Sequence, residues 1–223
     1  PKVSVVLLSY EGLHLIQDCL YSIEKIGCYP NLDLIIVDNG SSQPVKEFLR
    51  SYKARFPKIK LILHPENTGF AKGTNLGLAQ AEGEYIILLN NDTFVTRGWI
   101  QVMLAHFRQS PKLGLLGPVT NSIANEAKIK IHYKDMLDMQ EKAFVYTQGH
   151  QELLSTKMLA FFCTMMPKAV LDECGLLSEE YSLGMFEDDD YCKRALKAGY
   201  EIDIAKDVFV HHYESASMSK NKW

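Results

Sequence analysis

The sequence predicts an α/β fold in which helices cover both faces of a doubly wound, mostly parallel sheet. Short apolar runs alternate with helical patterns throughout residues 1–118. These runs are apolar at nearly every position, which is typical of strands buried on both faces. No internal repeat or low-complexity linker interrupts the alternation, so one α/β unit is expected.

The expected elements of the first half follow one another with short connections. Strands are expected at residues 3–9, 34–37, 60–63, 85–89 and 113–116. Helices are expected between them, at residues 13–26, 45–56, 70–81 and 99–107. Strands separated by helices in this way are expected to run parallel.

The second half is less regular. Residues 121–151 are polar and aperiodic, the composition of a mobile rim or lid. Helices are expected at residues 168–174 and 187–198, each followed by a glycine that ends it. A last strand, residues 208–210, leads into two adjacent histidines.

The composition indicates an ordinary globular protein and argues against several classes. Hydrophobic residues make up 47% of the chain and the formal net charge is −3, with no long basic run, so nucleic acid is not expected as a partner. Five cysteines without a CxxC pair argue against a zinc ribbon or a secreted disulfide framework. No apolar stretch approaches the ~20 residues of a membrane span. A cytoplasmic location is expected; attachment at the inner face of the membrane is not encoded in this chain and stays open.

Polar, turn-forming residues follow each of the first four expected strands. They occupy residues 9–11, 38–42, 64–69 and 90–93. In an open parallel sheet, ligands bind outside the carboxyl ends of the strands. One such segment alone is an ordinary turn, but four on the same edge predict a ligand site.

The fourth segment, Asn90-Asn91-Asp92, places oxygen atoms at the end of a buried strand. Mg²⁺ and Mn²⁺ prefer one or two carboxylates together with substrate phosphates. Asp92 is therefore a candidate metal ligand; the alternative is that it caps the segment that follows. Neither GxxxxGK[ST] nor GxGxxG follows the first strand, which argues against a P-loop nucleotidase and a dinucleotide oxidoreductase.

Four consecutive acids, residues 187–190, open the last expected helix, where the helix dipole favours carboxylates. Asp189 and Asp190 each have a basic residue one turn later, Lys193 and Arg194, and are expected to form surface pairs. Asp188 instead shares its helix face with Cys192, Ala195 and Leu196. Burial on that face would raise the pKa of Asp188 and suit it to act as a general base.

The two adjacent histidines are His211 and His212. Neighbouring side chains of an extended chain point to opposite sides, so at most one of them is expected in the site. A histidine at such a place is more often structural. A neutral imidazole would nevertheless be a suitable additional ligand for Mn²⁺.

Taken in order, these segments resemble the motifs of family 2 glycosyltransferases. The resemblance runs from residue 3 to residue 217 and is carried by residues 4–10, 36–42, 67–71 with Asn75 and Gly77, 89–92, 187–190 and 210–212. Each motif is weak alone, and together they are highly specific. The resemblance implies a GT-A fold, an inverting mechanism, and a divalent cation that holds the donor diphosphate.

The resemblance also implies roles for individual residues within one catalytic domain, residues 1–223, with a nucleotide-sugar-binding half (1–118) and an acceptor and catalytic half (119–223). The implied donor-binding residues are Ser9, Tyr10, Glu11, Asp38, Asn67, Gly69, Phe70, Asn75 and Asn91. The implied base that activates the acceptor is Asp188, supported by Glu187. The implied metal ligands are Asp92 and His211 or His212.

Two features depart from the family pattern. Asn90 stands where the DxD motif has its first acid, which predicts a weaker affinity for the cation. The chain ends at residues 220–223 without a folded-looking segment, so a fragment of a longer protein is one expectation.

The likeness of residues 67–71 to bacterial polysaccharide-building transferases, rhamnosyl ones included, favours a UDP- or dTDP-sugar donor and a glycan or lipid-linked acceptor. Two other functions would make different demands on the sequence. A non-catalytic sugar-nucleotide-binding module would need neither Asp92 nor Asp188. A nucleotidyltransferase would need a Gly-rich basic loop after the first strand, and residues 9–13 contain none.

Overall fold

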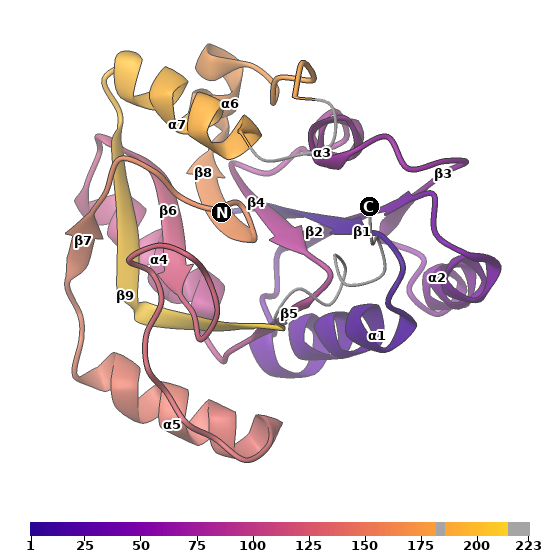
Figure 1. Ribbon diagram of the computed structural model, residues 1–223, viewed down its shortest axis with the longest axis horizontal. Helices are drawn as coiled ribbons and strands as arrows, with labels where there is room; N and C mark the ends of the chain where they lie inside the picture. The colour runs from indigo at the N-terminus through magenta and orange to yellow at the C-terminus, as the bar shows by residue number, and fades with distance from the viewer. Residues whose placement is uncertain (182–185, 214–223) are drawn as a thin grey trace.

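The computed structural model describes residues 1–181 and 186–213 (Figure 1). Its strands are β1 (Val3–Ser9), β2 (Leu32–Asn39), β3 (Lys60–His64), β4 (Tyr85–Asn90), β5 (Thr93–Val95), β6 (Leu113–Val119), β7 (Leu153–Ser155), β8 (Cys163–Pro167) and β9 (Glu201–His212). Its helices are α1 (Leu13–Tyr21), a π-helix (Ser22–Gly27), α2 (Gln43–Arg55), α3 (Phe70–Leu78), α4 (Trp99–Gln109), α5 (Met136–Gln148), α6 (Lys168–Cys174) and α7 (Glu187–Lys197). Residues 214–217 of the family-like stretch and the chain end at 220–223 lie outside the described residues.

The strands form one mixed sheet whose order is β3-β2-β1-β4-β8-β6-β9-β5, with β7 paired to β9. β1 pairs in parallel with β2 and β4, and β2 with β3. β8 is antiparallel to β4 and β6. The predicted α/β fold with a mostly parallel sheet is confirmed, and the polar segments after β1 to β4 share one edge.

Helices cover both faces of the sheet. α1, α2 and α4 pack on one face, and α3, α6 and α7 on the other (Figure 1). β1 is apolar at nearly every position because both of its faces are covered: Leu7 faces the first layer and Val6 the second, and both are buried. α3 lies very close to β1, since a Cβ on Gly77 would be 2.4 Å from Cγ1 of Val6.

The sequence predicts an irregular rim over residues 121–151, but the structure places the helix α5 within this range. Asp135 caps this helix: its Oδ1 accepts hydrogen bonds from the backbone N of Leu137 at 3.0 Å and of Asp138 at 2.9 Å. The helical pattern is hard to read because three large apolar side chains of α5 are exposed: Leu137, Phe144 and Val145.

The prediction missed β5, β7 and β8. β5 and β7 have three residues each, and β8 interrupts the strand–helix alternation. The last strand is also much longer than the predicted residues 208–210, because polar residues such as Asp203, Lys206 and Asp207 interrupt its apolar run. The long β9 pairs with β6, β7 and β5, and its end lies beside Thr93.

The helix predicted over residues 13–26 changes to a π-helix at Ser22. The Ser22 hydroxyl donates to the carbonyl of Cys19 at 2.7 Å and accepts from the N of Val95 at 3.1 Å. Gly27 is needed where this turn meets α4, since a Cβ there would lie 2.6 Å from Nε1 of Trp99. The π-helical turn at residues 22–27 therefore contacts β5 through Ser22 and α4 through Gly27.

All five cysteines are free thiols. Among the described residues, no helix combines the length and apolar character needed to cross a bilayer.

Candidate active site

The carboxyl ends of β1 and β2 present two buried polar atoms without a hydrogen-bond partner in the described part of the chain. These atoms are Oγ of Ser9 and Oδ1 of Asp38, which are register neighbours in the two strands. The other Asp38 oxygen, Oδ2, accepts a hydrogen bond from the N of Ser41 at 3.3 Å. Burial raises the pKa of Asp38. Buried polar atoms of this kind indicate a place where a bound ligand would supply the partners.

Glu11 joins the loops after β1 and β2. Its carboxylate accepts hydrogen bonds from the N and Oγ of Ser42, both at 2.8 Å. Its backbone N donates to Oγ of Ser41 at 2.9 Å, and its carbonyl accepts from the amide of Asn91 at 3.1 Å. Both side-chain oxygens of Glu11 are thus bonded within the protein, where they fix the rim of the predicted nucleoside pocket.

Asn39, which the sequence did not single out, ties β2 to the loop after β3. Its Nδ2 donates to Oδ1 of Asn67 and to the carbonyl of Gly69, both at 3.0 Å. Its Oδ1 accepts from the N and Oγ1 of Thr68, both at 3.1 Å. Oδ1 of Asn67 also accepts from the N of Gly69 at 2.9 Å. These bonds hold Gly69, whose φ is 84°, at the start of α3.

Asn75 on α3 holds the segment that precedes α7. Its Nδ2 donates to the carbonyl of Leu177 and to Oε1 of Glu179, both at 2.9 Å. Its Oδ1 accepts from the N of Leu177 at 3.0 Å. Asn75, predicted near the donor, therefore connects the two halves of the chain.

The remaining predicted donor residues lie at the same edge of the sheet. Tyr10 follows β1 and is half-buried, and the half-buried Phe70 opens α3. Asn91 follows β4 and is buried.

Asp92 and His212 form a pair at the end of β4 and β9. Nε2 of His212 lies 3.4 Å from Oδ1 of Asp92, a buried oxygen that accepts no well-aligned hydrogen bond from the described residues. Nδ1 of His212 lies 2.9 Å from the carbonyl of Ser122. Since a carbonyl only accepts, we assign the proton of the neutral imidazole to Nδ1, which leaves the lone pair on Nε2 facing Asp92.

Three neighbours fix the orientation of His212. The amide of Asn121 donates to its carbonyl at 3.0 Å and accepts from its backbone N at 2.9 Å. The ring of Phe162 stacks on the imidazole, with centroids 4.9 Å apart and an interplanar angle of 22°. Burial lowers the pKa of His212, and the carboxylate of Asp92 raises it. The net result is a pKa above the ordinary value of a histidine.

His211 makes different contacts. Its Nδ1 forms a hydrogen bond with the hydroxyl of Tyr133, and its ring packs edge-on against Tyr213 with centroids 4.4 Å apart. Its Nε2 is buried and has no partner among the described residues. Burial lowers the pKa of His211 to about 4, so the ring is neutral. Of the two histidines, His212 is therefore the one paired with Asp92.

The Asp92–His212 pair fits a cation that is shared with a substrate. Within the part of the chain that the structure describes, no three His, Cys, Asp or Glu side chains gather as a metal site. The pair nevertheless offers one carboxylate oxygen and one imidazole nitrogen with unused lone pairs. Mg²⁺ and Mn²⁺ need only this much from a protein when phosphates supply further ligands.

Asp188 is bonded to a two-residue segment that also supports the Asp92–His212 pair. Its Oδ2 accepts a hydrogen bond from the N of Phe161 at 3.2 Å. The carbonyl of the next residue, Phe162, accepts from the N of Asn90 at 2.9 Å, and its ring stacks on His212. Asp188 therefore borders the same edge of the sheet as the pair.

The prediction that burial raises the pKa of Asp188 is confirmed, and the charge of Glu187 adds to the effect of burial. Glu187 is itself buried, and its Oε2 accepts from the N of Phe186 at 3.1 Å. A raised pKa makes the Asp188 carboxylate a stronger base than an exposed one.

The rest of α7 follows the sequence prediction in part. Cys192 and Ala195 are buried, but Leu196, predicted on the same inward face, is exposed because it lies near the end of the helix. Asp190 accepts from Nε of Arg194 at 2.8 Å, as predicted. The pair predicted for Asp189 and Lys193 is not among the ion pairs of the described residues. Lys193 is exposed, where water competes with such a pair.

Four residues that shape this site were not predicted: Asn39, Asn121, Phe161 and Phe162. Asn39 adjoins Asp38, so its place in a strand-end motif was a usable signal. The other three lie in segments without periodicity, and their partners are far away in the sequence. No local pattern marks them.

Comparison with known proteins identifies the family. The model of Glycosyl transferase family 2 matches residues 4–175, and the chain belongs to this family. It is 24% identical over 215 residues to glycosyltransferase AglE of Haloferax volcanii, which covers 95% of this chain and 67% of the relative. The chain spans between 25% and 67% of the length of the curated relatives it matches.

Solved structures share the fold. GalNAc-T7 with UDP, GalNAc and Mn²⁺ superposes with a TM-score of 0.76 at 15% identity, over 95% of this chain and 43% of that one. S. aureus TarS in complex with UDP-GlcNAc gives a TM-score of 0.69 at 19% identity, over 100% of this chain and 62% of that one. The chain therefore has the GT-A fold.

Proposed function

We propose that this chain is the catalytic domain of an inverting, metal-dependent glycosyltransferase. It moves a sugar from a nucleotide-diphosphate sugar to a hydroxyl of a glycan or lipid-linked acceptor, in polysaccharide or glycan synthesis. One observation carries the proposal: the base candidate Asp188, the Asp92–His212 pair and the unpartnered atoms of Ser9 and Asp38 converge on one edge of the sheet.

The nucleoside end of the donor lies at Ser9 and Asp38 in this proposal. A carboxylate only accepts hydrogen bonds, so Asp38 suits a base that presents a ring N–H, as uracil, thymine and guanine do, rather than cytosine, whose N3 only accepts. This supports a UDP- or dTDP-sugar, rhamnosyl donors included. The UDP and UDP-GlcNAc held by GalNAc-T7 and TarS favour uridine.

The other donor-side residues divide into two groups. Tyr10, Gly69 and Phe70 line the nucleoside and diphosphate part of the site. The remaining residues form hydrogen bonds within the protein and so hold the loops of the site in place: Glu11, Asn67, Asn75 and Asn91.

Asp92 and His212 would hold the divalent cation, Mn²⁺ or Mg²⁺. When bound, this ion would neutralise charge that develops on the departing nucleotide diphosphate. Asn90 leaves only one carboxylate in the motif, and His212 compensates by supplying the second protein ligand.

The transfer is a single displacement in which Asp188 is the base. Asp188 takes the proton of the acceptor hydroxyl while that oxygen bonds to the anomeric carbon. On the opposite face, the bond from the anomeric carbon to the phosphate oxygen breaks, and its electrons leave with the nucleotide diphosphate. Glu187 supports the base because its charge helps to raise the pKa of Asp188.

Calorimetric binding of UDP, dTDP, GDP and CDP, each with and without Mn²⁺, tests the proposal. We expect one nucleotide to bind more tightly with Mn²⁺, and the Asp92→Asn and His212→Ala variants to lose that dependence while keeping the weaker metal-free binding. Binding without any metal dependence would support a non-catalytic sugar-nucleotide-binding module instead. If no nucleotide bound under either condition, the donor site would be wrong.

A further inference from the structure

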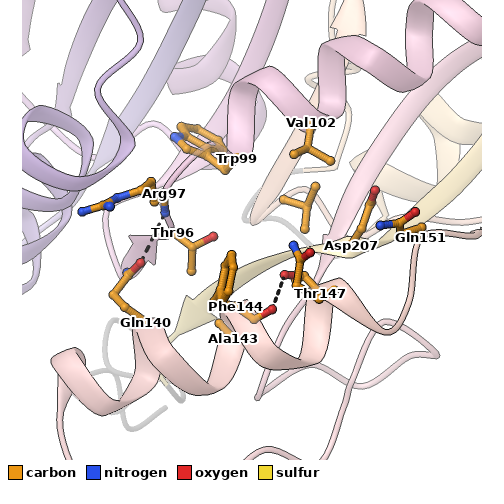
Figure 2. A pocket seen from close by; sticks show the side chains of 12 residues that line it. Thr96, Arg97, Trp99, Val102, Gln140, Ala143, Phe144, Thr147, Gln151 and Asp207 are labelled. Carbon is orange, nitrogen blue, oxygen red and sulfur yellow. Dashed lines mark hydrogen bonds between the residues drawn. The ribbon is translucent and has the colours of Figure 1, made fainter.

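A cleft with both polar and apolar lining residues lies between α4, α5 and β9. Its volume is about 340 Å³, at the lower end of the ~300–1,000 Å³ that is usual for small-molecule sites (Figure 2). Side chains that line it include Thr96, Arg97, Trp99, Phe144, Gln148 and Gln151. None of the predicted site residues is among its lining residues.

The cleft is separate from the Asp92–His212 pair. On β5, Asp92 of the pair precedes the strand and Thr96 of the cleft follows it. On β9, Val208 of the cleft lies four residues before His212 of the pair. At ~3.3 Å per residue, the two sites lie roughly 13 Å apart along the β5–β9 ladder. A molecule in the cleft would therefore not occupy the metal pair.

Both ends of the cleft are fixed by hydrogen bonds. At one end, the Gln140 amide donates to the carbonyl of Val95 at 3.0 Å and accepts from the backbone N of Arg97 at 3.3 Å (Figure 2). At the other end, both oxygens of Asp207 lie within 2.9 Å of Nε2 of His106. A ligand would thus meet a largely preformed site, which lowers the entropy cost of binding.

Several groups in the cleft have unused binding capacity. The side chains of Arg97, Gln148 and Gln151 form no hydrogen bond in the part of the chain that the structure describes. The ring of Phe144 is 65% exposed beside them, and the buried Trp99 closes the far wall. An exposed aromatic face beside groups that donate and accept hydrogen bonds is a surface on which a ligand ring can pack.

This combination selects a chemical class of ligand. The charged side chains among the lining residues are Arg97 and Asp207, and their formal charges sum to zero, so the lining as a whole does not favour a phosphate or a metal ion. Amide and guanidinium groups bond well to hydroxyls, and an aromatic face packs against an apolar ring face. A sugar ring presents both features.

We propose that this cleft binds a neutral sugar unit of a glycan, away from the acceptor hydroxyl that reacts. The choice of a glycan rests on the proposed function. The site would let the enzyme hold a growing chain at a point remote from its reacting end.

Saturation-transfer NMR with maltotriose, cellotriose and N-acetylated chitotriose, in the presence of saturating UDP and Mn²⁺, tests this site. We expect at least one trisaccharide to bind. Phe144→Ala should weaken that binding by roughly fivefold or more, through loss of the aromatic contact. Leu137→Ala is the matched control, because Leu137 is 73% exposed on the same helix and lies outside the cleft; it should leave the affinity unchanged.

The proposal is overturned if none of the three trisaccharides binds, or if Phe144→Ala binds them as the unmodified chain does. Calorimetry with UDP on the same samples separates the two claims. Nucleotide binding without trisaccharide binding overturns the cleft alone. Trisaccharide binding that is sensitive to Phe144→Ala, without binding of UDP, supports the cleft and contradicts a donor site for uridine nucleotides.

Discussion

At the scale of single residues, the environment of Asp188 matters most. Burial and the neighbouring charge of Glu187 raise its pKa, against the opposing hydrogen bond from the N of Phe161. Because folding raises this pKa, the contribution of Asp188 to stability is present below its ordinary pKa and is lost as the pH rises through the raised value. At neutral pH the carboxylate therefore costs stability, which is common for groups whose pKa serves catalysis.

A first prediction concerns pH. Asp188 must be ionised to accept a proton, so kcat/KM should fall as the pH drops through its raised pKa. Glu187→Gln removes a charge that raises this pKa, and should move the acid limb of the profile to lower pH. Asp190→Asn, which removes a carboxylate paired with Arg194, should leave the limb in place. An acid limb that does not move in Glu187→Gln would contradict the coupling.

A second prediction concerns Asn121, which makes two hydrogen bonds to the backbone of His212. Residues that orient a metal ligand typically contribute 10- to 100-fold to affinity, so Asn121→Ala should weaken Mn²⁺ binding in the presence of UDP by about tenfold or more. Titration of Mn²⁺ followed by electron paramagnetic resonance measures this without any turnover.

The control for Asn121 is Ser122→Ala. The imidazole of His212 bonds to the backbone carbonyl of Ser122, which this substitution keeps. Ser122→Ala should therefore bind Mn²⁺ nearly as the unmodified chain does. Equal affinity in Asn121→Ala would show that His212 is oriented without Asn121 or is not a ligand.

At the scale of elements, β9 and α3 determine how the site is assembled. β9 pairs with β6 along most of its length and with β5 at its end, which brings His212 beside the residue that follows Asp92. α3 packs tightly on β1, and its Asn75 holds the segment before α7. The sheet edge formed by β1 to β4 and the segment before α7 are thus joined by specific hydrogen bonds.

The packing of α3 gives a third prediction. Gly77→Ala would place a Cβ 2.4 Å from Cγ1 of Val6 on a buried strand, so overpacking should lower the free energy of unfolding by about 1–3 kcal/mol. Gly149→Ala is the control, since its nearest contact would be 3.6 Å away and its φ is −89°. Urea denaturation measures both. A Gly77→Ala variant as stable as Gly149→Ala would contradict the close contact.

At the scale of the whole molecule, local patterns were enough to predict β1 to β4 and the sheet edge at which these strands end. β1 to β4 are apolar at nearly every position, and parallel strands bring their ends to one edge, so Ser9, Asp38 and Asp92 could be grouped without a structure. The same reasoning failed where structure depends on distant partners. The segment 161–162 connects Asp188 to Asn90 and His212, and nothing in its own sequence indicates these contacts.

The second half was also harder because its elements break the simple patterns. α5 exposes large apolar side chains, β8 reverses the direction of the sheet, and β9 carries polar residues within a buried strand. Each of these is stabilised by tertiary contacts rather than by local propensity.

The central claim is that Asp188 is the base of a glycosyl transfer, and turnover of Asp188→Asn tests it most directly. Asn keeps an oxygen that accepts the hydrogen bond from Phe161, so the variant should fold, and nucleotide binding should change little. Release of nucleotide from the donor sugar should fall by about 10²–10⁴-fold. The control is Asp190→Asn, which removes a carboxylate that is not among the causes of the raised pKa of Asp188 and should keep the rate. Full activity in Asp188→Asn would show that another group takes the proton.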